Sequence, residues 1–176
     1  MNSATALRTK RLTYSGLLVA AGILLPQVFH LIGGGPVGSI FLPMHIPVLI
    51  AGLLCGPASG ALVGALSPVL SSLLTGMPPM AKLPFMFCEL IAYGFFAGLF
   101  TRRKWNVYFA MISSQVAGRV VYALALLAAA YLFRLDVPAV SSVAAAVVTG
   151  LPGIAIQLVL VPPVVLALRK AGKFYE

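Results

Sequence analysis

Two ionisable side chains lie deep inside long apolar runs of this sequence, and they offer its most distinctive chemistry. Glu89 and Arg119 each have mostly apolar neighbours on both sides. A lone charge in hydrocarbon is expensive, so both side chains are expected to face a shared interior, where they meet each other, water or a ligand. Two roles remain possible for Glu89 and Arg119 at this point. They can form a structural ion pair that fixes helix packing, they can bind a ligand, or one pair can do both.

Further polar side chains share helix faces with this pair. Residues spaced three or four apart lie on one face of a helix. Three successive apolar runs carry such residues: Glu89 with Tyr93, then Gln115 with Arg119 and Tyr122, then Gln157. On neighbouring helices these side chains converge, which predicts a binding cavity that opens outward. The two tyrosine rings serve either as ordinary packing or as stacking platforms for a flat ligand.

The chemistry of these groups limits the ligand. The guanidinium of Arg119 and the ammonium of Lys82, which lies at the expected outer mouth, suit a carboxylate or another anionic group. Glu89 suits a hydroxyl, amide or amine donor. Three methionines near the same mouth are expected either to form an adaptable apolar wall or simply to fill gaps: Met77, Met80 and Met86.

One histidine stands between two prolines in an otherwise apolar segment, with Pro43 and Pro47 on either side of His45. Proline is tolerated in the first turn of a helix, where its missing N–H has no partner to lose. The prolines therefore predict the outer end of a helix. His45 is expected either to close this helix end through a hydrogen bond or to form part of a wall or lid of the cavity.

The composition shows which solvent must surround these elements. The 176 residues are 61% hydrophobic and 9% charged, with a mean hydropathy of +1.05, whereas a soluble domain is about 45–50% apolar and about 25% charged. A small domain cannot bury that much apolar surface. The sequence therefore predicts an all-α integral membrane protein. Nucleic acid is not an expected partner, because the basic residues do not form one basic face.

Six membrane-spanning helices are predicted, since a span needs about 20 apolar residues, although the second and third are short. They cover residues 12–32, 40–55, 61–74, 83–100, 107–133 and 140–168. Breaks are expected at the glycine-rich residues 33–39, at residues 56–60 and at the double proline in residues 75–80. The six helices form one compact bundle over residues 1–176, without a cleavable signal peptide.

The basic residues predict the orientation of this bundle. Nine of the twelve lie in three clusters, before span one, after span four and after span six: Arg8, Lys10, Arg11, Arg102, Arg103, Lys104, Arg169, Lys170 and Lys173. With six spans all three clusters fall on one side of the membrane. The excess of Lys and Arg in cytoplasmic loops makes that side, and both termini, cytoplasmic. Arg134 and Asp136 then lie in an outer loop.

Small residues mark two further surfaces, because small residues four apart let helix backbones approach closely. Gly16 and Ala20 have this spacing in span one, where we expect docking of another membrane protein rather than internal packing. A second series is expected to pack internally: Gly52, Gly56, Gly60 and Gly64. Cys55 and Cys88 lie in apolar runs and are expected to be free thiols.

Long stretches of the sequence resemble the substrate-binding S components of bacterial energy-coupling factor (ECF) vitamin transporters. The stretches are RLTYSGLLVAAGILLP, FLPMHIPVLIAGLLCGPASGALVGALSPVLSSLLTGMPP and ELIAYGFFAGLF, and the later LPGIAIQLVLVPPVVLAL extends the resemblance over nearly the whole chain. The basic start, the small residues of the first helix, the P-x-H-x-P of the second and the SP…TGMPP of the third carry the resemblance together.

This resemblance implies a six-helix protein of the bacterial plasma membrane that binds a vitamin or vitamin precursor from outside with high affinity. It implies docking on one membrane coupling protein and two ATPases, and a toppling motion that turns the site inward. The family's A-x-x-x-A docking motif matches Gly16 and Ala20. Its pocket, built from helices four to six and the outer loops, falls where the polar residues Glu89, Tyr93, Gln115, Arg119 and Gln157 lie.

Pantothenate, a small acidic vitamin, meets the demands of Arg119, Lys82 and Glu89, whereas a flat pyrimidine or flavin precursor would use Tyr93 and Tyr122. The alternative function is a self-contained transporter that couples uptake to protons through Glu89, although no inverted repeat is visible. An enzyme is not expected, because no catalytic or metal-binding constellation is present. No cofactor or metal is predicted, and ATP hydrolysis would fall to the partner ATPases.

Overall fold

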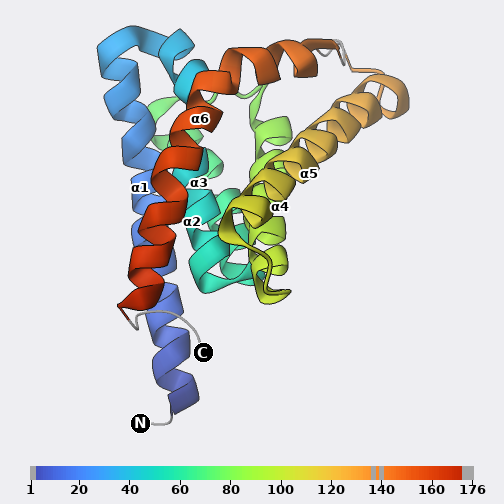
Figure 1. Ribbon diagram of the computed structural model, residues 1–176. Coiled ribbons are helices and arrows are strands. Elements are labelled where there is room, and N and C mark those ends of the chain that lie inside the picture. The colour runs from blue at the N-terminus through green and yellow to red at the C-terminus, as the bar shows by residue number, and fades with distance from the viewer. Residues whose placement is uncertain (1–2, 136–137, 139–140, 172–176) are drawn as a thin grey trace.

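The computed structural model describes residues 3–135, 138 and 141–171. The helices in chain order are α1 (Ser3–Phe41), α2 (His45–Cys55), α3 (Pro57–Thr75), α4 (Leu83–Arg102), α5 (Val107–Leu127), a π-helical turn η1 (Ala128–Leu132) and α6 (Ser141–Lys170) (Figure 1). Within these described residues, six helical stretches are long and apolar enough to cross a membrane: Leu7–Gly33, Pro36–Cys55, Pro57–Thr75, Leu83–Arg102, Val107–Leu132 and Ser141–Lys170. The predicted all-α architecture with six spans is confirmed.

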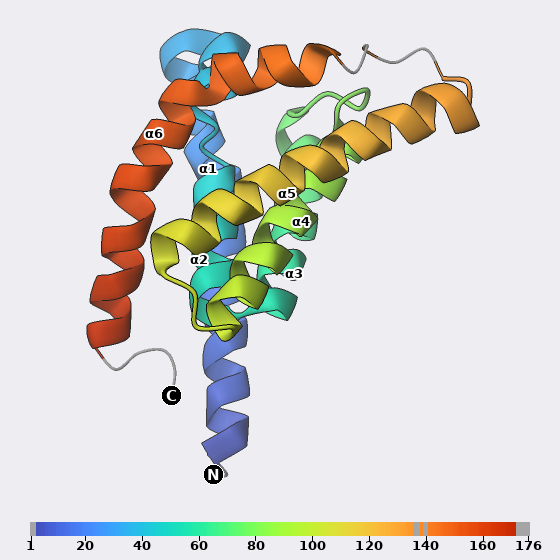
Figure 2. The ribbon, with the colours of Figure 1, turned by 45° about the vertical axis from the view of Figure 1, so that its right-hand side comes forward.

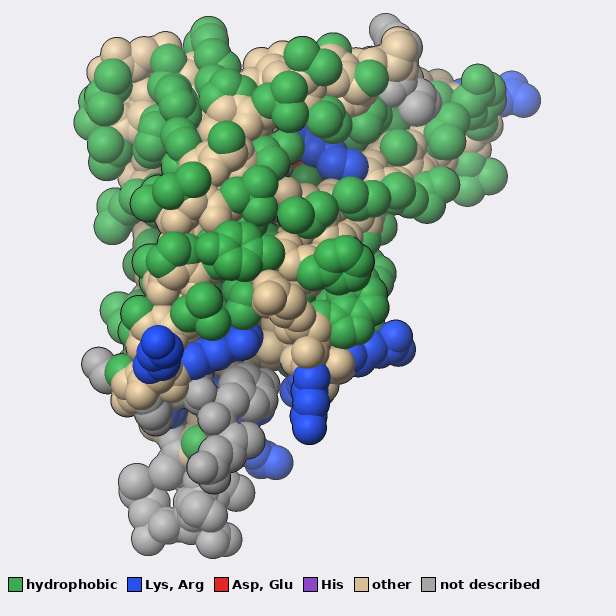
Figure 3. All heavy atoms as spheres, in the orientation of Figure 1, with side chains coloured by type: hydrophobic (Ala, Val, Ile, Leu, Met, Phe, Trp, Pro, Cys, Tyr) green, Lys and Arg blue, Asp and Glu red, His purple; other side chains and the backbone are tan. Residues whose placement is uncertain are grey.

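The helices place most of the basic residues at one end of the molecule. The start of α1, the end of α6 and the turn between α4 and α5 lie together at the lower end in Figure 1. Lys and Arg side chains gather at this end, below a wide apolar band (Figure 3). We call it the basic end, and we call the opposite end, which the charge pattern predicts to face outward, the outer end. The predicted cytoplasmic location of the basic end stays a prediction, and Lys173 and Asp136 lie outside the described residues.

The break expected at residues 33–39 is wrong. The α1 helix continues through this glycine-rich stretch and through Pro36 to Phe41, and it bends at the outer end instead of stopping (Figure 1). Glycine tolerates helical dihedrals, and a proline in a membrane helix can bend it without ending it. The chain leaves the helix at Leu42, which has a positive φ of 49° and precedes Pro43, because a residue before proline is disfavoured in the helical region.

The second predicted span is consequently built from two pieces. The α2 helix begins at His45, not at residue 40, and its 11 residues extend only about 16 Å at 1.5 Å per residue. The last turns of α1 complete the crossing, in the stretch Pro36–Cys55. Pro47 lies in the first turn of α2, as the pattern predicted. The junction at residues 42–44 therefore places irregular backbone inside the protein, at the level of the membrane.

The next two turns differ in length. Gly56 alone, with a φ of 96°, separates α2 from α3, so the turn expected to last until residue 60 is much shorter. The turn after α3 follows the prediction: α3 ends at Thr75, and α4 begins at Leu83. Hydroxyl groups fix this longer turn, because Ser71 donates to the Met77 carbonyl at 2.7 Å and Ser72 donates to the Pro78 carbonyl at 2.9 Å.

Glycines bring α2, α3 and α4 into backbone contact. A Cβ on Gly52 or on Gly60 would overlap the carbonyl oxygen of Gly94, and a Cβ on Gly64 would overlap the carbonyl oxygen of Leu90. Close approach of this kind is how small residues hold membrane helices together. The predicted internal packing is confirmed for three members of the series, whereas Gly56 forms the turn between α2 and α3. We call Gly52, Gly60, Gly64 and Gly94 the glycine seam.

The last two helices lean away from this rigid centre at the outer end. The α5 helix slants outward along its length, and the first turns of α6 run across the outer end before the helix bends and descends beside α1 (Figures 1 and 2). Pro152 lies inside this helix, and a proline can bend a membrane helix without ending it. A Cβ on Gly153 would lie only 2.6 Å from the carbonyl oxygen of Phe41, so glycine lets α6 rest on the end of α1.

Candidate ligand-binding site

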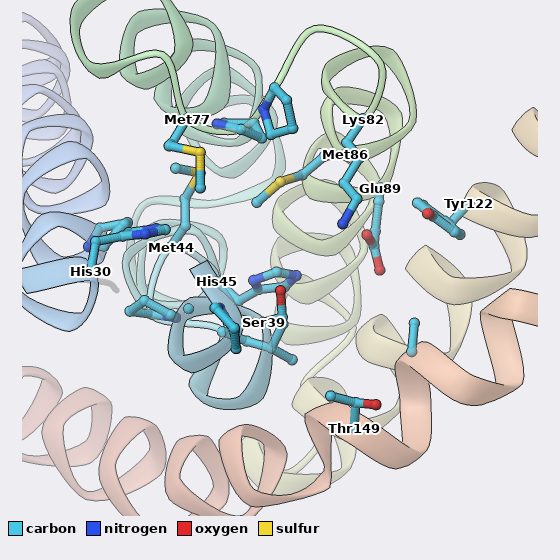
Figure 4. Close-up of a pocket in the computed structure, with 18 of the residues that line it drawn as sticks. His30, Ser39, Met44, His45, Met77, Lys82, Met86, Glu89, Tyr122 and Thr149 are labelled. Carbon is cyan, nitrogen blue, oxygen red and sulfur yellow. The ribbon is translucent and has the colours of Figure 1, made fainter. Parts of the chain in front are cut away.

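A cavity of about 570 Å³ lies at the outer end, among α1, the junction at residues 42–44, the turn before α4, α4, α5 and the first turns of α6. Its polar lining residues are His30, Ser39, His45, Lys82, Glu89, Arg119, Tyr122 and Thr149. All of them except Arg119 are labelled in Figure 4. Most of the other lining residues are proline, methionine and alanine. A mainly apolar pocket of about 300–1,000 Å³ with a few polar groups is typical of a small-molecule site.

One wall of the cavity is charged. Arg119 Nη1 lies 3.0 Å from Glu89 Oε1, and the two side chains are 15% and 5% exposed. Lys82 lines the same cavity, so two cationic side chains face one carboxylate. In Figure 3 a basic side chain is visible in a hollow between α5 and the first half of α6, at the level of the apolar band. Among the described lining residues, the single carboxylate leaves this wall with an excess of positive charge, which favours an anionic ligand group.

The ion pair is held in place by the contact between α4 and α5. Tyr93 donates a hydrogen bond to Glu89 Oε1 at 3.0 Å from the next turn of α4. A Cβ on Gly118 would overlap the Tyr93 ring, so the absence of a side chain there lets the ring lie directly against α5. Arg119 is the next residue. Its position opposite Glu89 therefore follows from the glycine before it.

The two glutamines form a second polar pair beside the cavity. Gln115 Nε2 donates to Gln157 Oε1 at 2.7 Å, and Gln157 Nε2 lies 3.4 Å from the Leu42 carbonyl oxygen. Both side chains are buried, at 8% and 1% exposure. These bonds join α5, α6 and the junction at residues 42–44 around the wall of the site.

His45 occupies the first position of α2, where the chain enters the helix from the junction. The side chain is 4% exposed, lines the cavity, and lies with its ring centroid 5.1 Å from that of Tyr93. Neither Nδ1 nor Nε2 of the imidazole makes a well-formed hydrogen bond among the described residues, although the Leu42 carbonyl lies near enough to interact with the ring. The backbone N–H of His45 donates to the Leu42 carbonyl at 3.1 Å. The backbone thus closes this helix end, and the imidazole adds no well-formed hydrogen bond to it.

Most, but not all, of the predicted binding residues line the cavity. His45, Lys82, Glu89, Arg119 and Tyr122 do so. The predicted convergence of polar side chains from α4 and α5 is therefore found. Three further predicted residues are not among the lining residues and lie behind the wall instead: Tyr93, Gln115 and Gln157.

The structure adds lining residues that the sequence did not single out, among them His30, Ser39, Met44 and Thr149. Helical spacing could not identify them, because three of them lie on the long helices α1 and α6, which bend, and Met44 lies in the irregular junction at residues 42–44. Of the three methionines expected at the mouth, Met77 and Met86 line the cavity. The expectation for Met80 is wrong, since its side chain is 70% exposed.

Six spanning helices around a ligand-sized cavity, with a charged wall inside the membrane region, define a membrane-embedded substrate-binding protein. The sequence places it more closely: the family model described as the substrate-specific component of ECF transporters matches residues 10–165, and the chain belongs to this family. Comparisons with curated proteins and with solved structures found no match.

Proposed function

We propose that the chain is the high-affinity binding subunit for uptake of a small vitamin or vitamin precursor that carries a carboxylate, with pantothenate as the first candidate. The observation that carries this proposal is the cavity wall on which Arg119 and Lys82 outnumber the carboxylate of Glu89. The Nε atom of Arg119 is buried and has no partner among the described residues, so the guanidinium retains a donor for an anion.

The shape of the site supports a compact ligand over a flat heterocycle. Stacking between two tyrosine rings would need both Tyr93 and Tyr122 at the cavity surface. Tyr93 is 2% exposed, its hydroxyl is bonded to Glu89, and it does not line the cavity. Methionine and proline side chains around the centre instead suit a short, branched aliphatic body. We assign Tyr93, Gln115 and Gln157 to positioning of the residues that contact the ligand.

The test of this proposal is a thermal-shift screen of the purified chain, without any ATPase, against a panel of vitamins. A ligand at 100 times its Kd stabilises the folded state by about 2.7 kcal/mol, which is a readily measured rise in Tm. Pantothenate is expected to give the largest rise. A panel without any stabilising vitamin would contradict the proposal, and gradient-driven uptake by the lone chain would favour the proton-coupled transporter instead.

We further propose that α1 docks on an ECF energising module in the bacterial plasma membrane, through Gly16 and Ala20. Both residues are exposed, and no heavy atom lies within 4 Å of a Cβ added at Gly16. The coupling protein would pack on this open surface, and its two ATPases would supply the energy at the basic end. An exposed pair of small residues in a spanning helix allows close helix packing of this kind.

Replacing Gly16 with leucine is expected to leave ligand binding unchanged and to reduce ATP-driven uptake at least about tenfold, because a branched side chain keeps the two backbones apart. The measurement is uptake of the bound vitamin in cells that also express the coupling protein and both ATPases, together with co-purification of the complex. Ala155→Leu, at an exposed position of α6, is the matched control. Full uptake by Gly16→Leu would show that docking does not use this surface.

A further inference from the structure

The imidazole of His45 is the polar group of the site that most needs an explanation. It is almost fully buried, and neither ring nitrogen makes a well-formed hydrogen bond among the described residues, although the Leu42 carbonyl lies near enough to interact with one of them. Buried polar side chains in folded proteins are nearly always hydrogen-bonded, since an unpaired one loses the bonds it had with water. A side chain that needed only to fill space here would be apolar.

The imidazole is not free to find a partner elsewhere. His45 stands in the first turn of α2, its backbone N–H is bonded to the Leu42 carbonyl, and its ring packs on the buried ring of Tyr93. Figure 4 shows the ring at the centre of the cavity, between Met44 and Glu89. Its partner must therefore enter the cavity.

Water can hydrogen-bond to the imidazole while the cavity holds no ligand. A ligand that displaces this water loses affinity unless one of its own groups makes the same hydrogen bonds. The group must match the imidazole, which offers a donor and, when neutral, also an acceptor. A carboxylate only accepts and is better placed on Arg119 and Lys82, whereas an ammonium only donates. An amide presents its donor and its acceptor on opposite sides. A hydroxyl rotates, and so it can serve whichever nitrogen faces it.

We propose that His45 is a specificity-determining residue that forms a hydrogen bond with a hydroxyl group of the ligand, while Arg119 and Lys82 bind the ligand's carboxylate. The ligand class is then a hydroxylated carboxylic acid. This inference rests on the proposed function and narrows it, because many acidic vitamins carry no hydroxyl group. Pantothenate carries both groups, biotin carries a carboxylate without a hydroxyl, and pyridoxine carries hydroxyls without a carboxylate.

The first experiment compares these three vitamins, and the pantothenate analogue in which hydrogen replaces the secondary hydroxyl, by calorimetry on the wild-type chain. Pantothenate is expected to bind more tightly than its deoxy analogue by roughly 10- to 100-fold, the usual cost of leaving a buried polar group unpaired. Equal affinities of the pair, or tighter binding of biotin than of pantothenate, would overturn the inference and leave vitamin binding intact. If no vitamin binds, the proposed function fails as well.

The second experiment assigns this preference to His45. His45→Phe keeps a ring against Tyr93 and removes both nitrogens, whereas His45→Gln keeps a donor and an acceptor. The preference for pantothenate over the deoxy analogue is expected to fall to about twofold or less in His45→Phe and to persist in part in His45→Gln. The ligand-free His45→Phe chain is expected to melt no lower than wild type, because it buries no unpaired nitrogen. An unchanged preference in His45→Phe, or a lowered Tm without ligand, would show that His45 is structural.

Discussion

Replacing Arg119 with glutamine is expected to weaken pantothenate binding by about 2–5 kcal/mol, or roughly 30-fold and upward. The substitution removes the cation that we assign to the ligand carboxylate. It also leaves the buried carboxylate of Glu89 without its partner, 3.0 Å away in the wild type, so the Tm of the ligand-free chain is expected to fall. Isothermal titration calorimetry and thermal unfolding measure the two effects separately. Arg102→Gln, at an exposed position of the basic end, serves as the control.

A double variant separates the two roles of the ion pair. In Glu89→Gln with Arg119→Gln, two neutral amides can form a hydrogen bond where the ions did, and no buried charge lacks a partner. We expect this variant to regain most of the lost thermal stability but not pantothenate binding. Binding as tight as that of the wild type in the double variant would mean that Glu89 and Arg119 serve each other only, and the argument for an acidic ligand would then fail.

The second large effect is expected from Gly94→Ala in the glycine seam. The added Cβ would overlap the carbonyl oxygen of Gly60, and a backbone atom in the middle of a packed helix cannot move aside as a side-chain tip can. Overpacking of this kind costs about 1–3 kcal/mol, and occasionally more, so α3 and α4 are expected to separate with a large drop in Tm. Thermal unfolding in detergent measures this change. Gly16→Ala is the matched control, because open space surrounds that position, and an equal loss in both variants would contradict the role of the seam.

The number of spans was predictable from the sequence because length and hydropathy are local properties of each run. The exact path of the chain was not. Residues 33–39 have the composition of a turn, yet glycine and Pro36 are accommodated in a bent helix, and the helix ends at Leu42 instead. The placement of that break depends on the partners that surround α1, and local composition does not reveal them.

The candidate site was predictable to the same degree. Spacing correctly placed Glu89 and Arg119 toward one another, since a face of a helix follows from its period. Spacing did not tell which polar residues of a helix face reach the cavity surface and which, like Tyr93, lie behind the cavity wall. That distinction depends on how closely two helices approach, here through Gly118. His30, Ser39 and Thr149 join the site through bends that have no periodic signature.

The glycine seam and the cavity use adjacent faces of the same helix. On α4, Leu90 and Gly94 face the seam, whereas Glu89 and Met86 face the cavity. The rest of the cavity wall comes from α1, α5, α6, the turns and His45, which stands at the first position of α2, away from Gly52 of the seam. Substitutions in the cavity lining can therefore change the ligand preference without disturbing the helix packing at the glycine seam. A scaffold divided in this way is evolvable, because the glycine seam can be inherited unchanged while the residues that line the cavity adapt to a new ligand.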